Sequence, residues 1–455
     1  MEGRTESINV LMLPWLGHGH ISPFLELAKK LAERNFHIFF CSTPVNLGTI
    51  KDQISQKYSP SIELVELHLP SLPDLPPHYH TTKGLPPHLM PTLKKAFEMA
   101  SPGFHKIIKS LRPDLLIYDF LQPWAPALAS SLNIPGVEFL CCSTVMTCFV
   151  KHISLYPGIN FPFPGIYLRE YETHKFNLLL ESSVDGVKDA DKIEECFKQS
   201  LDVVLVKTFR EIEAEYIDYL SDITSKKIVP VGPLVQDSIY EEERKGIIEW
   251  LDKKERKSTL FVSFGTEFFL SKEDMEEIAY GLELSMLNFI WVVRFPVGEQ
   301  TSTTSTTLEA SLPEGFLERV GDRGMVVEGW APQARILEHS SIGGFVSHCG
   351  WSSVMESMKN GVPIVAMPMH LDQPCNARLV EDVGVGIEVK RDGNGNLHRE
   401  EVAMVIQAVV MGEKGESVRK KAKELGQNMI NNGDQEIDEA VEELVKLCLN
   451  KNCNP

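Results

Sequence analysis

Short apolar runs alternate with amphipathic stretches along the first half of the chain. "INVLMLP" (8–14) has the length of a buried strand, and "SPFLELAKKLAERN" (22–35) repeats its apolar residues at helical spacing. Ser22 is suited to cap that helix, and Pro23 suits its first position. Further buried strands are predicted at 36–43, 114–120, 136–142 and 202–209. Strands without polar alternation, separated by helices, indicate a parallel sheet that is covered on both faces.

The alternation breaks at "IVPVGPLVQDSIYEEERKG" (228–246), which is rich in proline and glycine and then in charge. It starts again with "STLFVSFGT" (258–266) and a helix at 271–285 that opens on an S-x-x-D capping box. A polar loop is predicted at 299–310, and the tail from 399 to 449 is expected to be helical. We therefore expect two Rossmann-like α/β domains at 1–235 and 247–435, a linker at 236–246 and a C-terminal helix at 436–455.

Two doubly wound parallel sheets in one chain are expected to face a shared cleft with the carboxyl ends of their strands. Ligands of such sheets bind at those ends, in the turns that lead into the following helices. Candidate functional residues are therefore sought in the turns that directly follow the predicted strands.

Composition limits the partners of the protein. Its 455 residues are 43% hydrophobic and 24% charged, and a net charge of −18 argues against a nucleic-acid or anionic-membrane partner. The nine cysteines form no C-x-x-C pair, which favours free thiols in a reducing compartment. No segment reaches the length of a membrane span, about 18 apolar residues, and the acidic N-terminus is unlike a secretory signal. We expect a cytoplasmic protein without a membrane span.

One turn of the second half has the features of a phosphate site. "GGFVSHCGWSSVMESMKNG" (343–361) is predicted to form a strand, a turn at Gly350 and a helix that Ser352 or Ser353 can cap. The amides at the start of such a helix bind phosphate. "SFGT" (263–266) forms a second turn of this kind, although both also fit ordinary strand-to-helix connections.

A longer stretch carries a resemblance to a known family. "WAPQARILEHSSIGGFVSHCGWSSVMESMKNGVPIVAMPMHLDQ" (330–373) resembles the nucleotide-sugar box of plant UDP-dependent glycosyltransferases, and "GHGHISP", "LIYDF", "VPVGPL" and "FVSFGT" extend the likeness over nearly the whole chain. The resemblance implies the GT-B fold, in which two Rossmann-like domains face a cleft. It also implies a UDP-sugar donor, a small-molecule acceptor and a monomeric enzyme.

The resemblance assigns a role to each matching residue of the box. Trp330 would stack on uracil, Ala331 and Gln333 would contact the uridine, and Glu356 would hold the ribose hydroxyls. The diphosphate would meet His348, Ser352 and Ser353, and the sugar would face Trp351, Asp372 and Gln373. The strand-end turns described above add Gly265, Thr266 and Gly350 as further diphosphate contacts. Taken singly, Trp330 also fits a core position and Glu356 a solvated helix residue.

Two positions of the box bear on the donor. Ser352 stands where the family usually has asparagine, and a shorter side chain without an amide predicts a weaker diphosphate contact. Gln373 resembles the residue of glucose-using members, whereas galactose users tend to carry histidine. We therefore expect UDP-glucose as donor, and we expect no metal or other cofactor.

The resemblance also implies the reaction and its base. Members of the family invert the anomeric centre when an acceptor hydroxyl attacks C1 of the sugar and UDP leaves. That hydroxyl needs a general base, and histidine suits the task near neutral pH. "LGHGHISP" aligns His20, rather than His18, with the family's base, and "LIYDF" aligns Asp119 with the carboxylate that orients it.

Three other interpretations fit parts of the sequence. "GHGHIS" partly matches the nicotinamide fingerprint, but Ser22 replaces its third glycine and no ribose-binding acid ends the second strand. A metal-dependent transferase would use an Asp-x-Asp triplet such as Asp189-Ala190-Asp191, which also fits a helix start. A non-catalytic UDP-sugar binder, or an epimerase of similar architecture, would need neither His20 nor Asp119.

The acceptor is expected to meet loops of the first half, such as 71–93 and 156–176, whose aromatic, proline and histidine content suits a flat or sugar-bearing natural product. "PPHLMPTL", "QPWAPALASSLNIP" and "HLDQPCNARLVEDVGVG" resemble the branch of the family that extends sugars already attached to flavonoids, terpenoids or apocarotenoids. The expected product is a flavonoid or terpenoid glycoside with a second glucose, with a 1,6 linkage favoured over 1,2. The alternative is direct transfer to an aglycone hydroxyl.

Overall fold

The computed structural model describes residues 7–236, 245–266, 268–295 and 308–450, and these divide into two units. The first unit combines Met1–Lys151, Asn177–Leu234 and Asn432–Pro455, and the second combines His152–Phe176 with Val235–Asn431. Most of the predicted linker and of the polar loop at 299–310 lies outside the described residues. The shared cleft concerns the placement of the two units and stays a prediction.

The first unit is built on a seven-stranded parallel sheet with strand order β3-β2-β1-β4-β5-β8-β9. Its central strands are buried along their whole length, which agrees with their unalternated apolar sequence. The strands are β1 (Ile8–Leu13), β2 (Phe36–Ser42), β3 (Ile62–Glu66), β4 (Leu115–Tyr118), β5 (Gly136–Leu140), β8 (Val203–Val206) and β9 (Lys227–Pro230). The order reverses between β1 and β4, and ligands of doubly wound sheets bind at such a point.

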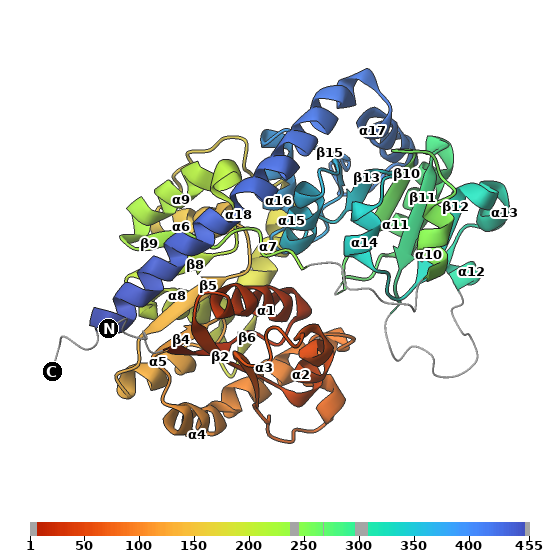
Figure 1. Ribbon diagram of the computed structural model, residues 1–455. Coiled ribbons are helices and arrows are strands. Elements are labelled where there is room, and N and C mark those ends of the chain that lie inside the picture. Colours follow the sequence, from red (N-terminus) through yellow and green to blue (C-terminus); the bar gives the residue numbers. More distant parts are fainter. Residues whose placement is uncertain (1–6, 237–244, 267, 296–307, 451–455) are drawn as a thin grey trace. The chain divides into compact units, whose positions relative to one another are not determined.

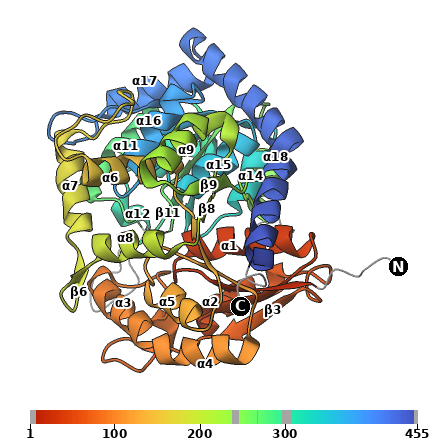
Figure 2. The same ribbon diagram turned by 90° about the vertical axis from the view of Figure 1, so that its left-hand side faces the viewer.

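Helices cover both faces of this sheet. Phe24 and Leu27 of α1 pack on one face together with Ala440 and Leu444 of α18, and Phe97 of α3 packs on the other face. Figure 2 shows α1 and α4 on opposite sides of the first strands. The helices of the first unit, or shared with the second, are α1 (His18–Ala32), α2 (Pro44–Ile50), α3 (Met90–Met99), α4 (Ser101–Leu111), α5 (Trp124–Ser131), α6 (Thr144–Leu155), α7 (Glu170–Leu180), α8 (Asp189–Gln199), α9 (Arg210–Thr224) and α18 (Glu416–Asn450). A short hairpin pairs β6 (Ser183–Val184) with β7 (Val187–Lys188).

The second unit is built on a six-stranded parallel sheet with order β12-β11-β10-β13-β14-β15, whose order reverses between β10 and β13 (Figure 1). The strands are β10 (Thr259–Ser263), β11 (Asn288–Val293), β12 (Gly324–Glu328), β13 (Ile342–Ser347), β14 (Ile364–Ala366) and β15 (Gly386–Glu388). Its helices are α10 (Lys245–Leu251), α11 (Lys272–Ser285), α12 (Leu308–Ser311), α13 (Phe316–Val320), α14 (Gln333–Glu338), α15 (Trp351–Lys359), α16 (Gln373–Asp382) and α17 (Arg399–Val410). Separate apolar clusters fill the two faces of this sheet. Both predicted α/β domains are therefore present, and the α/β two-domain GT-B architecture is confirmed.

The helix starts test three predictions from the sequence. The capping box is confirmed, because Ser271 Oγ accepts the amide of Asp274 at 3.1 Å. The start predicted at Ser22 and Pro23 is wrong, because α1 already begins at His18 and the amide of Ile21 donates to Gly17 O at 2.9 Å. Pro23 therefore lies inside α1.

The Asp-x-Asp triplet lies at a helix start. Asp189 is the first residue of α8, its carboxylate pairs with Lys94, and Asp191 also lies in the first turn. Acidic side chains stabilise the N-terminal end of a helix. This position agrees with the helix-start interpretation of the triplet.

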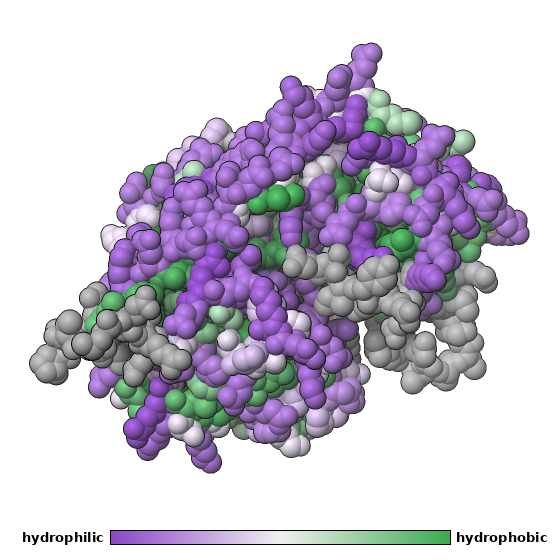
Figure 3. All heavy atoms as spheres, viewed as in Figure 1, coloured by the Kyte–Doolittle hydropathy of each residue, from purple (hydrophilic) through white to green (hydrophobic). Residues whose placement is uncertain are grey.

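The surface and the thiols agree with the composition. On the face seen in Figure 3 the described residues are mainly hydrophilic. Within the described part of the chain, no helix is both long and apolar enough to cross a membrane. Eight cysteines of that part are free, and seven of them are buried.

Candidate active site

His20 and Asp119 meet at the point where the strand order of the first sheet reverses. His20 lies in the first turn of α1, directly after β1, and Asp119 directly follows β4. The imidazole Nδ1 lies 2.8 Å from Asp119 Oδ2. The carboxylate is fully buried, whereas the imidazole side chain is 26% exposed. A solvent-accessible imidazole is therefore held by a buried acid.

Backbone amides fix the Asp119 carboxylate. Oδ2 also accepts the amide of Trp15 at 2.9 Å, and Oδ1 accepts the amide of Phe120 at 2.9 Å. The Phe120 ring stacks on the His20 imidazole, with ring centroids 5.0 Å apart and planes inclined by 13°. An imidazole that donates from Nδ1 to a carboxylate keeps Nε2 as its basic nitrogen. The sequence had not singled out Phe120, although it directly follows Asp119.

Among the described residues, one group of side chains has the composition and spacing of a metal site, and it includes His20 and Asp119. Ligand atoms of His20, Asp119 and Cys141 lie within 4.8 Å of one another. Burial, and then the charge of Asp119, raise the pKa of the Cys141 thiol well above its usual value, so the thiolate that binds metals is disfavoured. Asp119 also already accepts two amides and lies against the imidazole. The cluster is therefore better suited to proton transfer than to a metal ion.

The predicted phosphate turn lies between β13 and α15. Its helix begins at Trp351 with Gly350 as N-cap and no side-chain cap, so the predicted caps Ser352 and Ser353 are wrong. Gly350 takes this place because its carbonyl accepts the first intrahelical bond, from Val354 at 3.1 Å. The serines lie in the first helical turn, where side chains and amides can meet an anion.

His348 occupies the space left by two glycines. A Cβ atom on Gly350, or on Gly265 after β10, would lie 2.6 Å from its Nε2, so only glycine fits at either position. Gly265 also has a left-handed φ of +79°. Burial, and then the charge of His370, lower the pKa of His348 to about 3. The imidazole is therefore neutral near pH 7, with one ring nitrogen that can donate a hydrogen bond and one that can accept. Thr266 follows Gly265 in the same turn and is partly exposed.

Two helices bring the expected uridine-binding residues together. Gln333, the first residue of α14, donates from Nε2 to Glu356 Oε2 at 2.7 Å and to Ser353 Oγ at 3.1 Å. Trp330 is 42% exposed, which excludes a core position, whereas Ala331 is buried. The structure therefore groups Gln333 and Glu356, expected at the uridine, with Ser353, expected at the diphosphate.

The expected sugar-binding pair opens α16. Gln373 is buried, and its Oε1 accepts the amides of Met369 and His370, both at 3.0 Å. Asp372 Oδ2 accepts Asn376 Nδ2 at 2.9 Å, and the same amide group donates to Cys349 O at 2.9 Å. Asn376 thus connects α16 to the turn before α15, a contact that the sequence did not reveal.

Backbone strain accompanies these two turns. Cys349, one residue before Gly350, has a φ of +65°, and Leu371, one residue before Asp372, has a φ of +59°. Such conformations are costly for residues other than glycine and persist where the surroundings enforce them, often at functional sites. The amide of Cys349 donates to Ser347 Oγ at 3.1 Å, which helps to hold the first turn. Trp351, expected to face the sugar, is buried at the start of α15.

Comparisons with known proteins identify the family. The profile described as UDP-glucoronosyl and UDP-glucosyl transferase matches residues 243–423, and that described as glycosyltransferase, N-terminal domain matches residues 6–236. UDP-glucosyltransferase 29 of Panax ginseng is 54% identical over 454 residues, which cover 99% of this chain and 99% of that protein. The chain belongs to the plant UDP-dependent glycosyltransferases.

Other glycosyltransferases of the family extend the comparison. Beta-D-glucosyl crocetin beta-1,6-glucosyltransferase of Gardenia jasminoides is 51% identical over 440 residues, which cover 96% of this chain and 98% of that protein. The crystal structure of UGT73P12 of Glycyrrhiza uralensis, complexed with glycyrrhetinic acid 3-O-monoglucuronide, superposes with a TM-score of 0.84 at 25% identity and covers 98% of both chains.

As a UDP-glycosyltransferase, the protein is an enzyme that uses a UDP-sugar donor and a small-molecule acceptor. The nicotinamide oxidoreductase and the non-catalytic binder are thereby set aside. The roles assigned to individual residues, the monomeric state and the cytoplasmic location stay predictions.

Proposed function

We propose that this glycosyltransferase transfers glucose from UDP-glucose to a hydroxyl of a small-molecule glycoside, with inversion at the anomeric carbon. The observation that carries the proposal is the bond between His20 Nδ1 and the buried Asp119 carboxylate. A UDP-sugar binder has no need of this pair, whereas a transferase needs a base for its acceptor. The Asp119 carboxylate stabilises the imidazolium that forms when Nε2 takes the proton.

The reaction consists of one displacement. His20 Nε2 removes the proton of the acceptor hydroxyl while its oxygen attacks C1 of the glucose. The bond between C1 and the diphosphate oxygen breaks, and UDP leaves with the electron pair. The amides at the start of α15 and the neutral His348 imidazole donate hydrogen bonds that stabilise the negative charge developing on the diphosphate. No metal ion is required for this step.

The geometry of Gln373 supports glucose as the transferred sugar. Two backbone amides engage Oε1 of its side chain, so the side-chain NH₂ group is turned the other way and can donate to a sugar hydroxyl. Asp372 beside it can accept from a neighbouring hydroxyl. Such a paired donor and acceptor discriminates between sugars that differ in the direction of one hydroxyl.

The relatives support a glycoside as acceptor. The Gardenia jasminoides protein is named for transfer to glucosyl crocetin with a 1,6 linkage, and UGT73P12 was crystallised with a monoglucuronide. Transfer of this kind would add a second sugar to one already present. We therefore favour a 1,6-linked disaccharide product over a 1,2-linked one, with direct transfer to an aglycone as the second candidate.

The decisive experiment compares a flavonoid or terpenoid aglycone with its own monoglucoside as acceptor for UDP-glucose. We expect UDP release to depend on the acceptor, to be faster with the monoglucoside and to continue in excess EDTA. NMR of the product is expected to show a β-1,6 linkage. Faster reaction of the aglycone would support the second candidate, and loss of activity in EDTA would contradict the metal-free reaction.

A further inference from the structure

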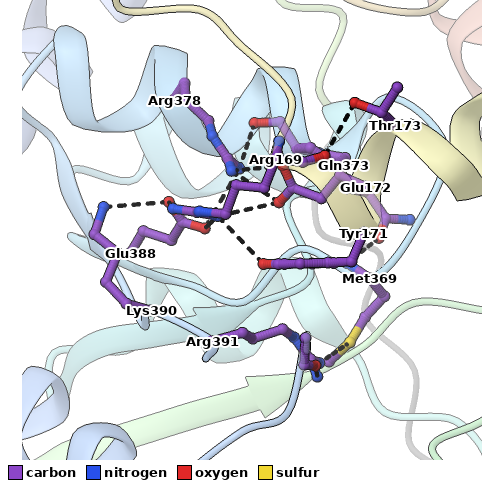
Figure 4. A network of polar contacts seen from close by, with 12 residues as sticks. Arg169, Tyr171, Glu172, Thr173, Met369, Gln373, Arg378, Glu388, Lys390 and Arg391 are labelled. Carbon is purple, nitrogen blue, oxygen red and sulfur yellow. Dashed lines mark hydrogen bonds and ion pairs between the residues drawn. The ribbon is translucent and has the colours of Figure 1, made fainter. Parts of the chain in front are cut away.

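Four charged side chains form a closed ring of ion pairs within the second unit (Figure 4). Arg169 donates from Nη1 and Nη2 to the two oxygens of Glu388, at 2.7 and 3.0 Å. Glu388 Oε1 lies 3.3 Å from Arg378 Nη1, whose Nη2 donates to both oxygens of Glu172 at 2.8 Å. Glu172 Oε1 closes the ring by accepting from Arg169 Nη1 at 3.1 Å.

Three of the four side chains of the ring are buried, and that of Arg169 is 19% exposed. The side chains of Arg378, Glu172 and Glu388 are 2%, 5% and 1% exposed. Its two cations balance its two anions, and Arg378 also donates to Pro374 O at 3.0 Å. Burial alone would raise the pKa of Glu388, but the hydrogen bond from Arg169 and the charge of Arg378 keep it below its usual value. The pairing with two guanidinium groups therefore favours the charged form of Glu388 despite its burial.

The ring connects three elements of different origin in the sequence. Arg169 directly precedes α7 and Glu172 lies in its first turn, where Glu172 Oε2 also accepts the amide of Arg169 at 2.7 Å. Arg378 belongs to α16, and Glu388 ends β15. Tyr167 packs its ring against Arg378, whose guanidinium carbon is 5.2 Å from the ring centroid. These contacts attach the segment His152–Phe176 to the sheet and helices of the second unit.

A buried ring of this kind is a costly way to hold two helices together. Similar apolar side chains often stabilise a contact as well or better, because buried ions lose their hydration. Paired charges with directional hydrogen bonds favour one orientation of the elements that carry them, because a rotation or a shift of one element would break a pair. The ring thus fixes the direction of α16 more narrowly than apolar packing would.

The first residue of α16 is the proposed sugar-binding Gln373, and its N-cap is Asp372. Arg378 reaches back to the first turn through Pro374, so the ring and the sugar-binding pair share the same rigid helix start. We propose that the ring of Arg169, Glu172, Arg378 and Glu388 positions Asp372 and Gln373 for recognition of the donor sugar, which makes sugar selection depend on the segment His152–Phe176. This inference rests on the proposed function of that pair.

The proposal predicts a selective defect. Under the proposed function, UDP would contact residues of α14 and α15, whereas the start of α16 would contact only the sugar. Breaking the ring should therefore weaken recognition of the sugar and leave the binding of UDP unchanged. A purely structural role would weaken the binding of both.

Glu172→Gln and Arg169→Met test this in the full-length enzyme. The first variant removes one charge of the ring, and the milder second one leaves the pair between Glu172 and Arg378 intact. Glu277→Gln is the matched control, because Glu277 pairs with Arg399 in the same unit but ties α11 to α17. The measurements are KM and kcat with UDP-glucose and UDP-galactose, and the inhibition constant of UDP.

For Glu172→Gln we expect KM for UDP-glucose to rise about tenfold, the value of one hydrogen bond, and the preference for UDP-glucose over UDP-galactose to fall by a similar factor. Arg169→Met should show the same pattern more weakly, and Glu172→Asp should restore part of the preference. The inhibition constant of UDP should change less than about twofold in all variants. Equal weakening of UDP and UDP-glucose, or an unchanged preference in both ring variants, would overturn the proposal.

The variant Gln373→Ala distinguishes a failure of the ring proposal from a failure of the proposed function. If this variant loses the sugar preference and the ring variants keep it, the ring proposal is wrong and the proposed function stands. If Gln373→Ala also keeps the preference, the sugar-binding role of the pair is wrong as well. Should Glu172→Gln fail to fold, which thermal unfolding would show, Arg169→Met carries the test.

Discussion

Two histidines of this enzyme are given different chemistry by their surroundings. His20 is partly exposed, and its Nδ1 lies against the buried Asp119 carboxylate, which leaves Nε2 as its basic nitrogen. His348 is buried, and burial followed by the charge of His370 lowers its pKa to about 3. The first imidazole is therefore suited to take a proton, and the second is suited to donate a hydrogen bond without changing charge.

The pair of His20 and Asp119 gives the most direct prediction for single residues. His20→Ala should lower kcat by about 10²–10⁴, the usual contribution of a general base, while the inhibition constant of UDP stays the same. Asp119→Asn should act in the same direction, because it removes the charge that stabilises the imidazolium. The control is His18→Ala, since His18 is exposed at the first position of α1. Comparable losses in the His18 and His20 variants would contradict the assignment.

The buried acid Glu138 of β5 predicts how the stability of the enzyme depends on pH. Burial, and then the charge of Asp119 against the opposing effect of Lys151, raise the pKa of Glu138 from 4.5 to about 8. The folded state thus keeps a proton that the unfolded chain releases above pH 4.5. This contribution to stability is complete below that pH and is lost as the pH rises toward 8.

Glu138→Gln should remove this dependence, because glutamine keeps the shape of the protonated acid. Between pH 5 and 8 the free energy of unfolding of the natural enzyme should fall relative to the variant by about 1.4 kcal/mol per pH unit. Urea unfolding across this range measures it. Glu63→Gln, on an exposed position of β3, is the control and should follow the natural enzyme. Parallel curves for all three proteins would contradict the buried-acid argument.

At the scale of elements, the turns after β10 and β13 pack together around the His348 imidazole. Gly265→Ala should raise the inhibition constant of UDP about tenfold, because the added Cβ would lie 2.6 Å from Nε2 of His348 at a φ of +79°. Gly393→Ala is the control, since its Cβ would have no atom within 4 Å. Titration of both variants with UDP, with circular dichroism as a folding check, measures the difference. Unchanged UDP affinity in Gly265→Ala would contradict the role of this turn.

The elements also show what the sequence could and could not predict. Buried strands were readable because parallel strands carry continuous apolar runs, and Ser271 was readable as a cap because its partner lies three residues away. The start of α1 was misplaced because Pro23 is typical of a first turn but lies inside this helix. Ser352 and Ser353 were misassigned as caps because Gly350 fills that place with its backbone alone.

Contacts between residues far apart in the sequence explain why other parts of the site could not be predicted. The resemblance placed His20 and Asp119, which are far apart in sequence, because their flanking motifs matched a known pattern. No pattern marked Arg169 and Glu172 as partners of Glu388 and Arg378, since all lie in ordinary polar contexts and meet only in the fold. The grouping of His152–Phe176 with the second unit follows from those contacts and was for the same reason invisible in the sequence.

At the scale of the whole molecule, each unit has its own sheet, its own core and its own part of the chemistry. Apolar clusters fill both faces of each sheet. His20 and Asp119 follow β1 and β4, and Gly265 and His348 follow β10 and β13, the strands between which the order of each sheet reverses. The proposed base His20 belongs to the first unit, and the residues predicted to bind the donor belong to the second. The stability of each unit should therefore respond to a different ligand.

UDP should stabilise the second unit selectively. A ligand that binds only the folded form adds RT ln(1 + [L]/Kd), about 2.7 kcal/mol at one hundred times Kd. Hydrogen exchange should then slow for the most protected amides of β10, β13 and α15, whereas those of β1, β4 and β5 should keep their rates. Uridine, which lacks the diphosphate, is the matched control and should protect α15 less. Equal protection of both sheets by UDP would contradict the separate-core argument, because it would require the two units to unfold as a single cooperative body.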